Sequence, residues 1–340
     1  MSRSPDPDVS IILPVYNAAA TLPAALASIA GQTFTAWECL IIDDGSCDDS
    51  AARAAQQAAY DARFRLLRHA HGGIVAALNA GLAAARAPLI ARMDADDTCA
   101  PQRLARQVAL LNENPAIGVA ACRVRHVSDG SVGAGFRAYV TWCNTILTPD
   151  DHARNRFVEA PLVHPTAMFR RSLVARYGGY DAAHVWPEDY ELWLRWMAHG
   201  VRFAKVPDVL FDWYDRPTRL SRTDARYATM AFYACKTHYL VRGPLRGCRR
   251  VAVWGAGRAA RQRAALLTQA GIQIACYIDV DPRKIGRCVA SVPVLAPEML
   301  SRVHDMPLLI YVANRGARDA IRAYLRGTRF NEGKNLWFVA

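Results

Sequence analysis

Long apolar runs are missing from this 340-residue sequence. A membrane-spanning helix needs roughly 18–20 consecutive apolar residues, and the nearest segment, residues 74–90, is interrupted by Asn79 and Arg86. The first eight residues, MSRSPDPD, contain no apolar core of the kind that signal peptides have. We therefore expect a cytoplasmic protein without transmembrane helices.

Cysteine pairs and zinc-type spacings are also missing. The nine cysteines are an odd number, and no two of them form a Cys-x-x-Cys pair. A disulfide framework or a zinc site would need paired or regularly spaced cysteines. The cysteines are therefore expected to be reduced and to pack in the core, as they do in cytosolic proteins.

Lysine is scarce, because only 4 of the 42 basic residues are lysines and the rest are arginines. The formal net charge of +12 favours phosphate-bearing substrates, an anionic membrane surface or nucleic acid as partners. An arginine-rich surface without such a partner would give the same composition. No basic cluster is interleaved with aromatic residues, so nucleic acid is not expected as a partner. Peripheral contact with the inner face of a membrane stays open.

Short apolar runs do alternate with helical segments over the first third of the chain. This alternation is typical of an α/β protein with a mostly parallel sheet, and ligands of such folds bind beyond the carboxyl ends of the strands. The expected strands are residues 9–15, 37–42, 64–67 and 88–93, and the expected helices are residues 21–31, 49–60, 71–85 and 101–112.

The rest of the chain is expected to complete this domain and to add a second one. A strand is expected over residues 117–127 and a helix over residues 188–197. Residues 128–160 contain several glycines and are expected to be irregular, with a mobile loop over a cleft as one interpretation. A second βα pattern begins at residue 249, so the domain boundary is placed near position 245 and the expected domains are residues 1–245 and residues 246–340.

Three carboxylates, those of Asp94, Asp96 and Asp97, follow the fourth expected strand. Crowded carboxylates repel one another unless a cation neutralises them, and hard oxygen ligands suit Mn²⁺ or Mg²⁺. Asp43 follows the second expected strand, so acids lie at the carboxyl ends of two strands. A metal site at this edge of the sheet is predicted, with Asp97 either a member or a helix cap.

Eight motifs occur in order over the first domain: VSIILPVYN (9–17), QTF (32–34), IIDDGS (41–46), LNAG (78–81), MDADD (93–97), HPT (164–166), YGGY (177–180) and PEDY (187–190). Through them, the first domain resembles family 2 glycosyltransferases of the GT-A fold. The resemblance implies transfer of a sugar from a nucleotide-diphosphate donor, with a UDP-sugar expected, to a hydroxyl acceptor with inversion at the anomeric carbon.

The resemblance also implies roles for single residues. Asp96 would bind the metal that contacts the diphosphate, and Asp94 would bind the ribose or assist the metal. Asp43 would accept a hydrogen bond from N3–H of a uracil base. His164 would contact the diphosphate or the metal, although a structural histidine at a strand start fits equally well.

Further donor-binding residues are expected around the end of the first strand. Pro14, Tyr16 and Asn17 would line the nucleotide side of the site. Tyr16 would pack against the base, or it is an ordinary aromatic residue at a strand end. Arg92 would pair with the diphosphate or offset the acidic cluster, and the sequence leaves both roles open.

Inversion in one displacement requires a base that takes the proton of the acceptor hydroxyl. Asp189 matches the Glu-Asp motif of the family at the start of an expected helix and is the expected base, with Glu188 as its substitute. Without the motif, the alternative interpretation is that both acids only stabilise this helix, because negative side chains interact favourably with the N-terminal end of the helix dipole.

The second domain is expected to be Rossmann-like. Gly255 and Gly257 follow an expected strand in a Gly-x-Gly-x-x-Ala pattern, and Asp279 ends the next strand roughly 20 residues on, as in the dinucleotide fingerprint. Residues 278–286 are similar to a motif of nucleotide-sugar-handling domains. Bound NAD, a bound nucleotide sugar and an empty scaffold all stay open, and no residue for hydride transfer stands out.

Two other functions compete with sugar transfer. A sugar nucleotidyltransferase would need a Gly-rich basic loop after the first strand, and residues 14–17 offer none. A non-catalytic scaffold that binds nucleotide sugars would not need the base. The expected partners are a nucleotide-sugar donor and a saccharide or lipid-linked acceptor, in the synthesis of a cell-surface polysaccharide or glycolipid. The sugar, the linkage and the oligomeric state are left open.

Overall fold

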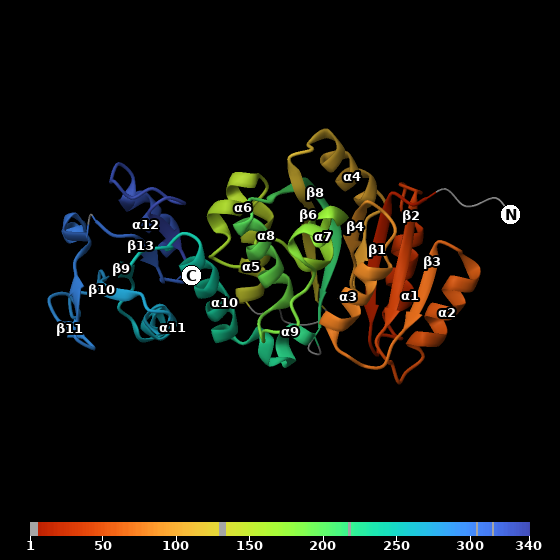
Figure 1. Ribbon diagram of the computed structural model, residues 1–340, viewed down its shortest axis with the longest axis horizontal. Coiled ribbons are helices and arrows are strands. Elements are labelled where there is room, and N and C mark those ends of the chain that lie inside the picture. The colour runs from red at the N-terminus through yellow and green to blue at the C-terminus, as the bar shows by residue number, and fades with distance from the viewer. Residues whose placement is uncertain (1–5, 129–133, 217–218, 304, 315) are drawn as a thin grey trace. The chain divides into compact units, whose positions relative to one another are not determined.

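The computed structural model describes residues 6–128, 134–216, 219–303, 305–314 and 316–340. The chain forms two compact units, each with its own sheet (Figure 1). The first unit contains residues 1–152 and 161–223, and the second unit contains residues 153–160 and 224–340. No helix among the described residues combines the length and the apolar character that crossing a bilayer requires.

The first unit alternates strands and helices, as the sequence predicts. Its elements are β1 (Val9–Val15), α1 (Leu22–Ala30), β2 (Trp37–Asp43), α2 (Ser50–Tyr60), β3 (Phe64–Arg68), α3 (Ile74–Ala84), β4 (Leu89–Arg92), β5 (Thr98–Cys99), α4 (Arg103–Glu113), β6 (Ile117–Ser128), α5 (Ala134–Thr145), α6 (Pro149–Asn155), β7 (Met168–Arg170), α7 (Arg171–Tyr177), α8 (Glu188–Ala198), β8 (Arg202–Asp215) and α9 (Leu220–Thr223).

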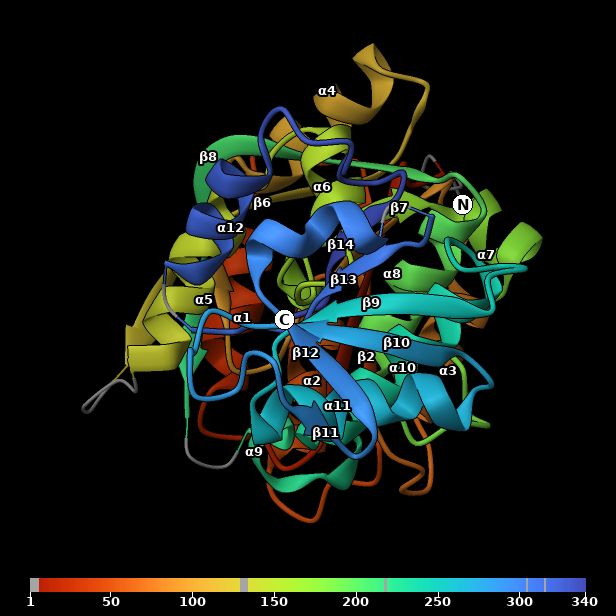
Figure 2. The same ribbon diagram turned by 90° about the vertical axis from the view of Figure 1, so that its left-hand side faces the viewer.

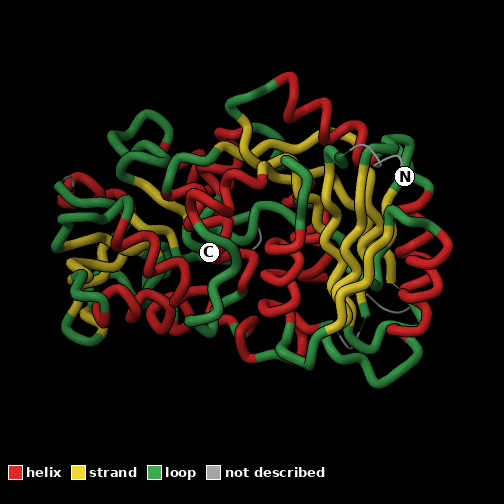
Figure 3. Tube along the Cα trace, turned by 45° about the vertical axis from the view of Figure 1, so that its right-hand side comes forward, coloured by secondary structure: helices red, strands yellow, loops and turns green. Residues whose placement is uncertain are grey.

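One eight-stranded sheet, drawn in yellow in Figure 3, runs through the first unit in the order β3-β2-β1-β4-β7-β6-β8-β5. The strands β3, β2, β1 and β4 are parallel, whereas β7 is antiparallel to both of its neighbours. Val15 at the end of β1 lies beside Asp43 at the end of β2, and Ile12 of β1 lies beside Arg92 at the end of β4. The carboxyl ends of these strands therefore share one edge of the sheet.

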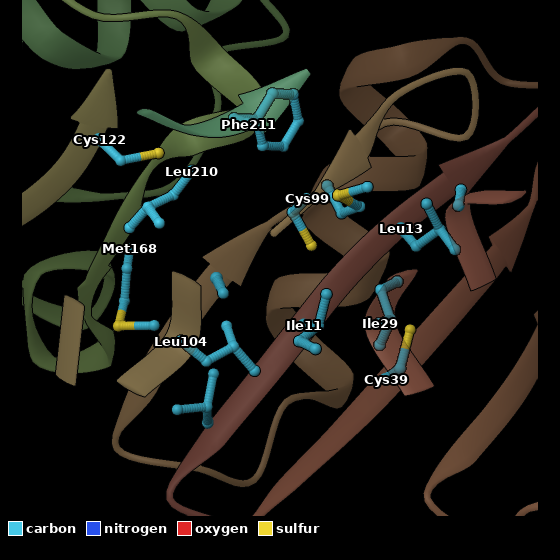
Figure 4. Packing of buried hydrophobic residues seen from close by; sticks show 14 of the residues in the cluster. Ile11, Leu13, Ile29, Cys39, Cys99, Leu104, Cys122, Met168, Leu210 and Phe211 are labelled. Carbon is cyan, nitrogen blue, oxygen red and sulfur yellow. The ribbon is translucent and has the colours of Figure 1, made fainter. Parts of the chain in front are cut away.

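The two faces of this sheet carry separate hydrophobic cores, because successive side chains of a strand point to opposite faces. Ile11 and Leu13 of β1 belong to one core, to which α1 and α4 contribute Ile29 and Leu104 (Figure 4). Ile12 belongs to the other core, which α3 and α8 cover. Burial on both faces explains why β1 and β2 are mostly apolar, with Ser10 and Glu38 as polar residues within them.

All nine cysteines are free, and six of them are buried. Cys39, Cys99, Cys122 and Cys143 pack in the core of Figure 4, where the first three are labelled. They behave as small apolar side chains, in agreement with the prediction of packing cysteines, whereas Cys47 and Cys288 are exposed.

Residues 134–155 form α5 and α6, so the expectation of an irregular segment is wrong there. Phe136, Tyr139, Val140 and Cys143 recur at helical spacing along α5 and pack against the core that contains Ile11. The glycines near position 130 favour an irregular segment, whereas the apolar spacing that follows them indicates a helix. Residues 129–133 of the same segment lie outside the described residues.

The second unit is also an α/β structure. Its main elements are α10 (Thr229–Arg242), β9 (Arg250–Trp254), α11 (Arg258–Gln269), β10 (Gln273–Ile278), β11 (Cys288–Val289), β12 (Val292–Leu295), β13 (Leu308–Ile310), α12 (Ala317–Leu325) and β14 (Leu336–Phe338). The sheet order is β11-β12-β10-β9-β13-β14, and Figure 2 shows β12, β10 and β9 side by side. Apart from the short antiparallel β11, the strands are parallel in the order 3-2-1-4-5, as in doubly wound nucleotide-binding sheets.

The second unit begins before α10, not near residue 245. Tyr233 of α10 stacks on Tyr311 with ring centroids 6.1 Å apart. Lys236 Nζ donates hydrogen bonds to the carbonyl oxygens of Val158 (2.7 Å) and Val339 (3.0 Å). These contacts hold α10 in the second unit, and they bring the short segment around Val158 with it.

Candidate active site

The turn between β4 and β5 brings three carboxylates together. Asp94, Asp96 and Asp97 each place one carboxylate oxygen within 4.8 Å of the others. Asp97 is 1% exposed, and its Oδ1 accepts a hydrogen bond from the N–H of Tyr214 (2.8 Å). Its Oδ2 is buried and has no hydrogen-bond partner among the described residues. Such an oxygen is the kind of ligand that a hard divalent cation prefers.

The three carboxylates have different pKa values because their neighbours differ. Burial raises the pKa of Asp97 well above its usual range, against the weaker opposing charge of Arg219. Burial and the charge of Asp94 raise the pKa of Asp96. Burial also acts to raise the pKa of Asp94, but the charge of Arg92 leads the effects that lower it overall. The cluster thus holds more negative charge than its surroundings stabilise, and a divalent cation would offset that excess.

Arg92 faces the acids from the end of β4. Its side chain is buried, and its Nη2 lies 2.6 Å from Asp94 Oδ1. Its Nη1 donates to the carbonyl oxygen of Met93. In the structure, Arg92 therefore pairs with the acidic cluster, which was one of the two roles that the sequence left open.

A second buried arginine, Arg103 of α4, supports this turn and was missed in the sequence. Its Nη2 donates to the carbonyl oxygens of Arg92 (2.7 Å) and Pro165 (2.8 Å), and its Nε donates to Gln107 Oε1 (3.1 Å). Arg103 thus ties the end of β4 to the turn that carries His164. The only local signal was the i, i+4 spacing of two polar residues, Arg103 and Gln107, on an otherwise apolar helix face.

The ends of β1 and β2 form the neighbouring part of the site. Asp43 is 1% exposed, and its Oδ1 accepts a hydrogen bond from the N–H of Ser46 (3.3 Å). The carboxylate of Asp44 instead accepts the N–H groups of Gly72 and Gly73, both at 2.9 Å. Asp44 therefore caps the N-terminus of α3 from a neighbouring loop.

The loop after β1 is fixed against the loop after β2. Pro14 is buried within β1. Asn17 has a φ of 49°, in the left-handed region that asparagine tolerates better than most residues. Its Oδ1 accepts the N–H of Cys47 (2.8 Å). Asn17 thus holds the shape of the loop that presents Tyr16.

Tyr16 and His71 form an aromatic pair near Asp43. Tyr16 is 48% exposed, and its ring stacks on His71 with centroids 4.1 Å apart and an interplanar angle of 24°. His71 Nδ1 lies 2.9 Å from Asp44 Oδ2, which orients the imidazole. An exposed flat pair is suited to packing against a nucleobase. His71 does not stand out in the sequence, because only the fold brings it to Tyr16.

The helix α8 begins with the two acids that the sequence proposed as bases. Glu188 is buried and Asp189 is half-buried. His164 Nδ1 lies 4.0 Å from Glu188 Oε1, and His164 Nε2 lies 2.8 Å from Tyr180 Oη. Burial holds the pKa of His164 well below its usual range, so the ring is neutral. Among the described residues, the cluster of candidate metal ligands contains Asp97 and not His164.

Tyr180 connects the acids of α8 with the acidic turn. Burial raises the pKa of its hydroxyl, the charge of Arg92 opposes this, and the charges of Glu188, Asp189 and Asp94 add to it. The charges of Glu188, Asp189 and Asp94 all act on this one hydroxyl group, so all three acids lie within electrostatic range of Tyr180.

Arg219 is a further residue that the sequence analysis did not single out. Its Nη1 donates to the carbonyl oxygen of Tyr214 (2.7 Å), and its guanidinium lies 4.6 Å from the ring centroid of Trp213. The N–H of Tyr214 binds Asp97. Arg219 is thus held beside the acidic turn, where its charge acts on the pKa of Asp94 and Asp97.

The glycine loop of the second unit is hydrogen-bonded by a side chain of the same unit. Gly255 has a φ of 122°, a conformation that favours glycine, and Gly257 caps α11. Asp279 Oδ2 accepts the N–H of Ala256 (2.9 Å) and lies 3.2 Å from Lys284 Nζ. The acid that would bind a ribose in the dinucleotide fingerprint is therefore engaged with the loop itself.

The sequence matches known proteins over the region that carries this site. Residues 10–178 match the family model described as Glycosyl transferase family 2. The chain is 29% identical over 245 residues to the putative glycosyltransferase EpsE of Bacillus subtilis, covering 68% of this chain and 82% of that protein. It is 29% identical over 204 residues to the amylovoran biosynthesis glycosyltransferase AmsE of Erwinia amylovora, covering 59% of this chain and 74% of that protein.

Solved structures share the fold. TarS of S. aureus, solved with UDP-GlcNAc, superposes with a TM-score of 0.58 and 15% identity, covering 77% of this chain and 71% of that chain. The mannosyltransferase PcManGT of Pyrobaculum calidifontis, solved with GDP-Man and Mn²⁺, superposes with a TM-score of 0.50 and 21% identity, covering 70% and 63%. By its family match, its relatives and its GT-A fold, this chain belongs to glycosyl transferase family 2 and is a glycosyltransferase.

Proposed function

We propose that the protein transfers a sugar from a nucleotide-diphosphate donor, a UDP-sugar, to a hydroxyl acceptor with inversion, and that the transfer depends on a divalent metal. The cluster of Asp94, Asp96 and Asp97, with three carboxylate oxygens within 4.8 Å of one another, carries the proposal. A glycosyltransferase whose leaving group is a diphosphate needs positive charge at that position.

The residues present fit a hard cation such as Mn²⁺ or Mg²⁺. The donor set is entirely carboxylate oxygen, and Asp97 Oδ2 is buried without a hydrogen-bond partner among the described residues. When bound, the ion would supply Lewis-acid stabilisation of the charge that develops on the departing diphosphate. Arg92 and Arg219 add fixed positive charge beside the same carboxylates.

The nucleoside of the donor is proposed to bind at the ends of β1 and β2. The exposed ring of Tyr16, stacked on His71, would pack against the base, and Asp43 would accept a hydrogen bond from it. Binding of UDP-GlcNAc by TarS supports a uridine donor, as does the resemblance of residues 41–46 to the motif of the family.

Asp189 is the proposed base. It lies half-buried in the first turn of α8, where the helix dipole favours its ionised form. Ionised, it would take the proton of the acceptor hydroxyl as that oxygen attacks the anomeric carbon. Glu188, next to it, is buried 4.0 Å from His164, which favours a positioning role for Glu188.

The acceptor is proposed to be a saccharide or a lipid-linked saccharide in the synthesis of a surface polysaccharide or glycolipid, at the cytoplasmic side of the membrane. The name of AmsE, an amylovoran biosynthesis glycosyltransferase, supports a polysaccharide. For the second unit we propose a scaffold without a redox step, since Asp279 is engaged by Ala256 and Lys284.

The proposal is tested by a donor screen. Purified protein is given UDP-, GDP- and dTDP-sugars with Mn²⁺ or with EDTA, and release of the nucleoside diphosphate is measured together with thermal shifts. We expect metal-dependent release of UDP from one sugar. Formation of a nucleoside triphosphate from a nucleotide sugar and added pyrophosphate would instead indicate a nucleotidyltransferase. The absence of a thermal shift with every nucleotide sugar would contradict the donor site.

The Asp189→Asn variant tests the base. Because Asn keeps the shape of the side chain but cannot take a proton, transfer should fall by about 10²–10⁴-fold while the affinity for UDP with Mn²⁺ stays within about twofold. The matched control is Asp181→Asn, on the loop before α8, which should keep transfer near the level of the unsubstituted protein. Equal transfer by the Asp189 variant would exclude it as the base.

A further inference from the structure

A basic hollow lies at the edge of the first sheet opposite the acidic turn. It is lined by residues at the amino ends of β6 and β8 and by α7, and its volume is about 280 Å³. Arg170 lines it and pairs in the sheet with Leu89, the first residue of β4. The acidic turn follows Arg92, the last residue of β4. The hollow is therefore separate from the candidate active site.

The positive charge of the hollow comes from three arginines. Arg170 is fixed at the wall, because its Nε and Nη2 donate to the carbonyl oxygens of Ile117 (3.0 Å) and Leu111 (2.6 Å). Arg176 and Arg202 are exposed, and neither forms an ion pair within the described part of the chain. No aspartate or glutamate is among the described residues that line the hollow.

The unpaired arginines stand out against others on the same unit. Arg106 and Arg125 are exposed as well, and each lies within 2.8 Å of an aspartate oxygen. Arg176 lies over the ring of Tyr177, 5.1 Å from the ring centroid. Exposed guanidinium groups that line a hollow without a carboxylate can donate to an external anion, and phosphate oxygens match their geometry.

The remaining wall adds a hydroxyl and a flat surface. Ser172 lines the hollow, and Tyr177 stacks on His199 with centroids 4.7 Å apart and an interplanar angle of 13°. His199 follows the last residue of α8. The hollow therefore contacts the far end of the helix whose first turn carries the proposed base.

A larger hollow of about 520 Å³ adjoins the first one and shares Arg202, Pro115 and Ala116 with it. Leu110 and Leu147 give part of its lining an apolar character, and Glu113 adds a carboxylate to this second hollow. A phosphate held by Arg202 would therefore have space beside it for the group to which the phosphate is esterified.

We infer that the two hollows bind a phosphate ester, with the phosphate between Arg176 and Arg202 and the esterified group beside Leu110 and Leu147. The ester is either a soluble molecule or the headgroup of an anionic lipid, because both present the same phosphate oxygens. The site does not depend on the proposed transferase chemistry, since it lies at the other edge of the sheet.

The test compares two double variants of the full-length protein. Arg176→Gln/Arg202→Gln removes two charges from the hollow, and Arg53→Gln/Arg246→Gln removes two charges from exposed positions elsewhere. Binding of inorganic phosphate and glycerol phosphate is measured by calorimetry, and binding to vesicles of phosphatidylglycerol or phosphatidylcholine by sedimentation. EDTA is present throughout, so that a metal at the acidic turn does not recruit phosphate.

We expect the hollow variant to bind at least tenfold more weakly than the control variant, with unchanged melting temperature because both arginines are exposed. Saturable binding of glycerol phosphate would identify a soluble ester, and binding to phosphatidylglycerol vesicles alone would identify a lipid headgroup. Equal weakening by both double variants, or no binding of any probe, would overturn the inference. The Asp96→Asn variant should bind the probes normally, which separates this site from the transferase site.

Discussion

At the scale of single residues, the chemistry of this protein depends on charges that the fold forces together. Asp94, Asp96 and Asp97 lie in one tight turn, and the buried Arg92 at the end of β4 pairs with Asp94. Arg103 of α4 binds the carbonyl oxygen of Arg92. The sequence revealed these acids because they are adjacent in the chain. It did not reveal Arg103, His71 or Arg219. The groups of the site that they act on, which are Pro165 for Arg103, Tyr16 for His71 and the acidic turn for Arg219, lie far away along the chain, and only the fold brings them together.

Glu38 is a second buried acid, and it serves stability. It is 2% exposed in β2 and accepts hydrogen bonds from Ser10 Oγ (2.7 Å), Arg65 Nη1 (2.7 Å) and Arg86 Nε (3.0 Å). Burial acts to raise its pKa, but the hydrogen bonds of Ser10, Arg86 and Arg65 together lower the pKa to about 2. Its charged form is therefore the one that the folded state stabilises.

The Glu38→Gln variant should lose about 1–3 kcal/mol of unfolding free energy at neutral pH. The folded pKa of about 2 lies below the unfolded value of about 4.3. The contribution of the charge is therefore complete above pH 4.3 and disappears as the pH falls toward 2. Urea unfolding of both proteins between pH 3 and pH 7 checks this. A gap that widens toward low pH would contradict the assignment, and Glu113→Gln, at an exposed position, is the control.

At the scale of elements, α4 is a brace between β4 and the turn before β7. Arg103 donates hydrogen bonds to two backbone carbonyl groups, those of Arg92 and Pro165. All three residues are buried, so water cannot readily replace Arg103 as the hydrogen-bond donor. Removing the guanidinium leaves both oxygens without that donor, and unsatisfied buried groups are costly.

The Arg103→Met variant should therefore lose about 2–4 kcal/mol of unfolding free energy. Arg106→Met on the same helix removes an exposed ion pair with Asp208, 2.8 Å long, and should lose less than about 1 kcal/mol. Thermal or urea denaturation measures both values. If the two variants lost equal stability, Arg103 would not have the bracing role.

The elements also show why the sequence predicts some parts of this fold better than others. The strands β1 and β2 are buried on both faces, so they appear as short, mostly apolar runs that are distinct from surface segments. The helix α5 buries only one face, and its apolar residues are separated by polar ones after a glycine-rich stretch. Contacts with the sheet determine which residues of α5 are buried, and the local pattern of apolar residues is only a weak signal of these contacts.

At the scale of the whole molecule, the chain crosses between its units more than once. Residues 153–160 belong to the second unit although they lie within the stretch that forms the first. Phe157 and Val158 in this segment are 2% and 4% exposed. A simple boundary near residue 245 does not describe this arrangement, because sequence patterns show where elements begin but not which elements pack together.

A fragment that ends at residue 223 should therefore expose Phe157 and Val158, whose burial is worth about 1.5–3 kcal/mol each. We expect this fragment to bind a hydrophobic dye and to self-associate in gel filtration. The same fragment with Phe157→Ser and Val158→Thr should bind less dye and elute as a smaller species. Identical behaviour of the two fragments would show that the segment is not the exposed surface.

The segment around Val158 has a further consequence during synthesis on the ribosome. Phe157 and Val158 leave the exit tunnel well before α10, which carries Lys236, the hydrogen-bond donor to Val158. Because translation proceeds at roughly 5–20 residues per second, this apolar segment of the nascent chain stays exposed to solvent for several seconds. All residues of the first unit have thus been synthesised while residues 153–160, which belong to the second unit, still lack their packing partners. Slow translation through residues 161–242 would prolong the interval in which chaperones, or another nascent chain, can bind that piece.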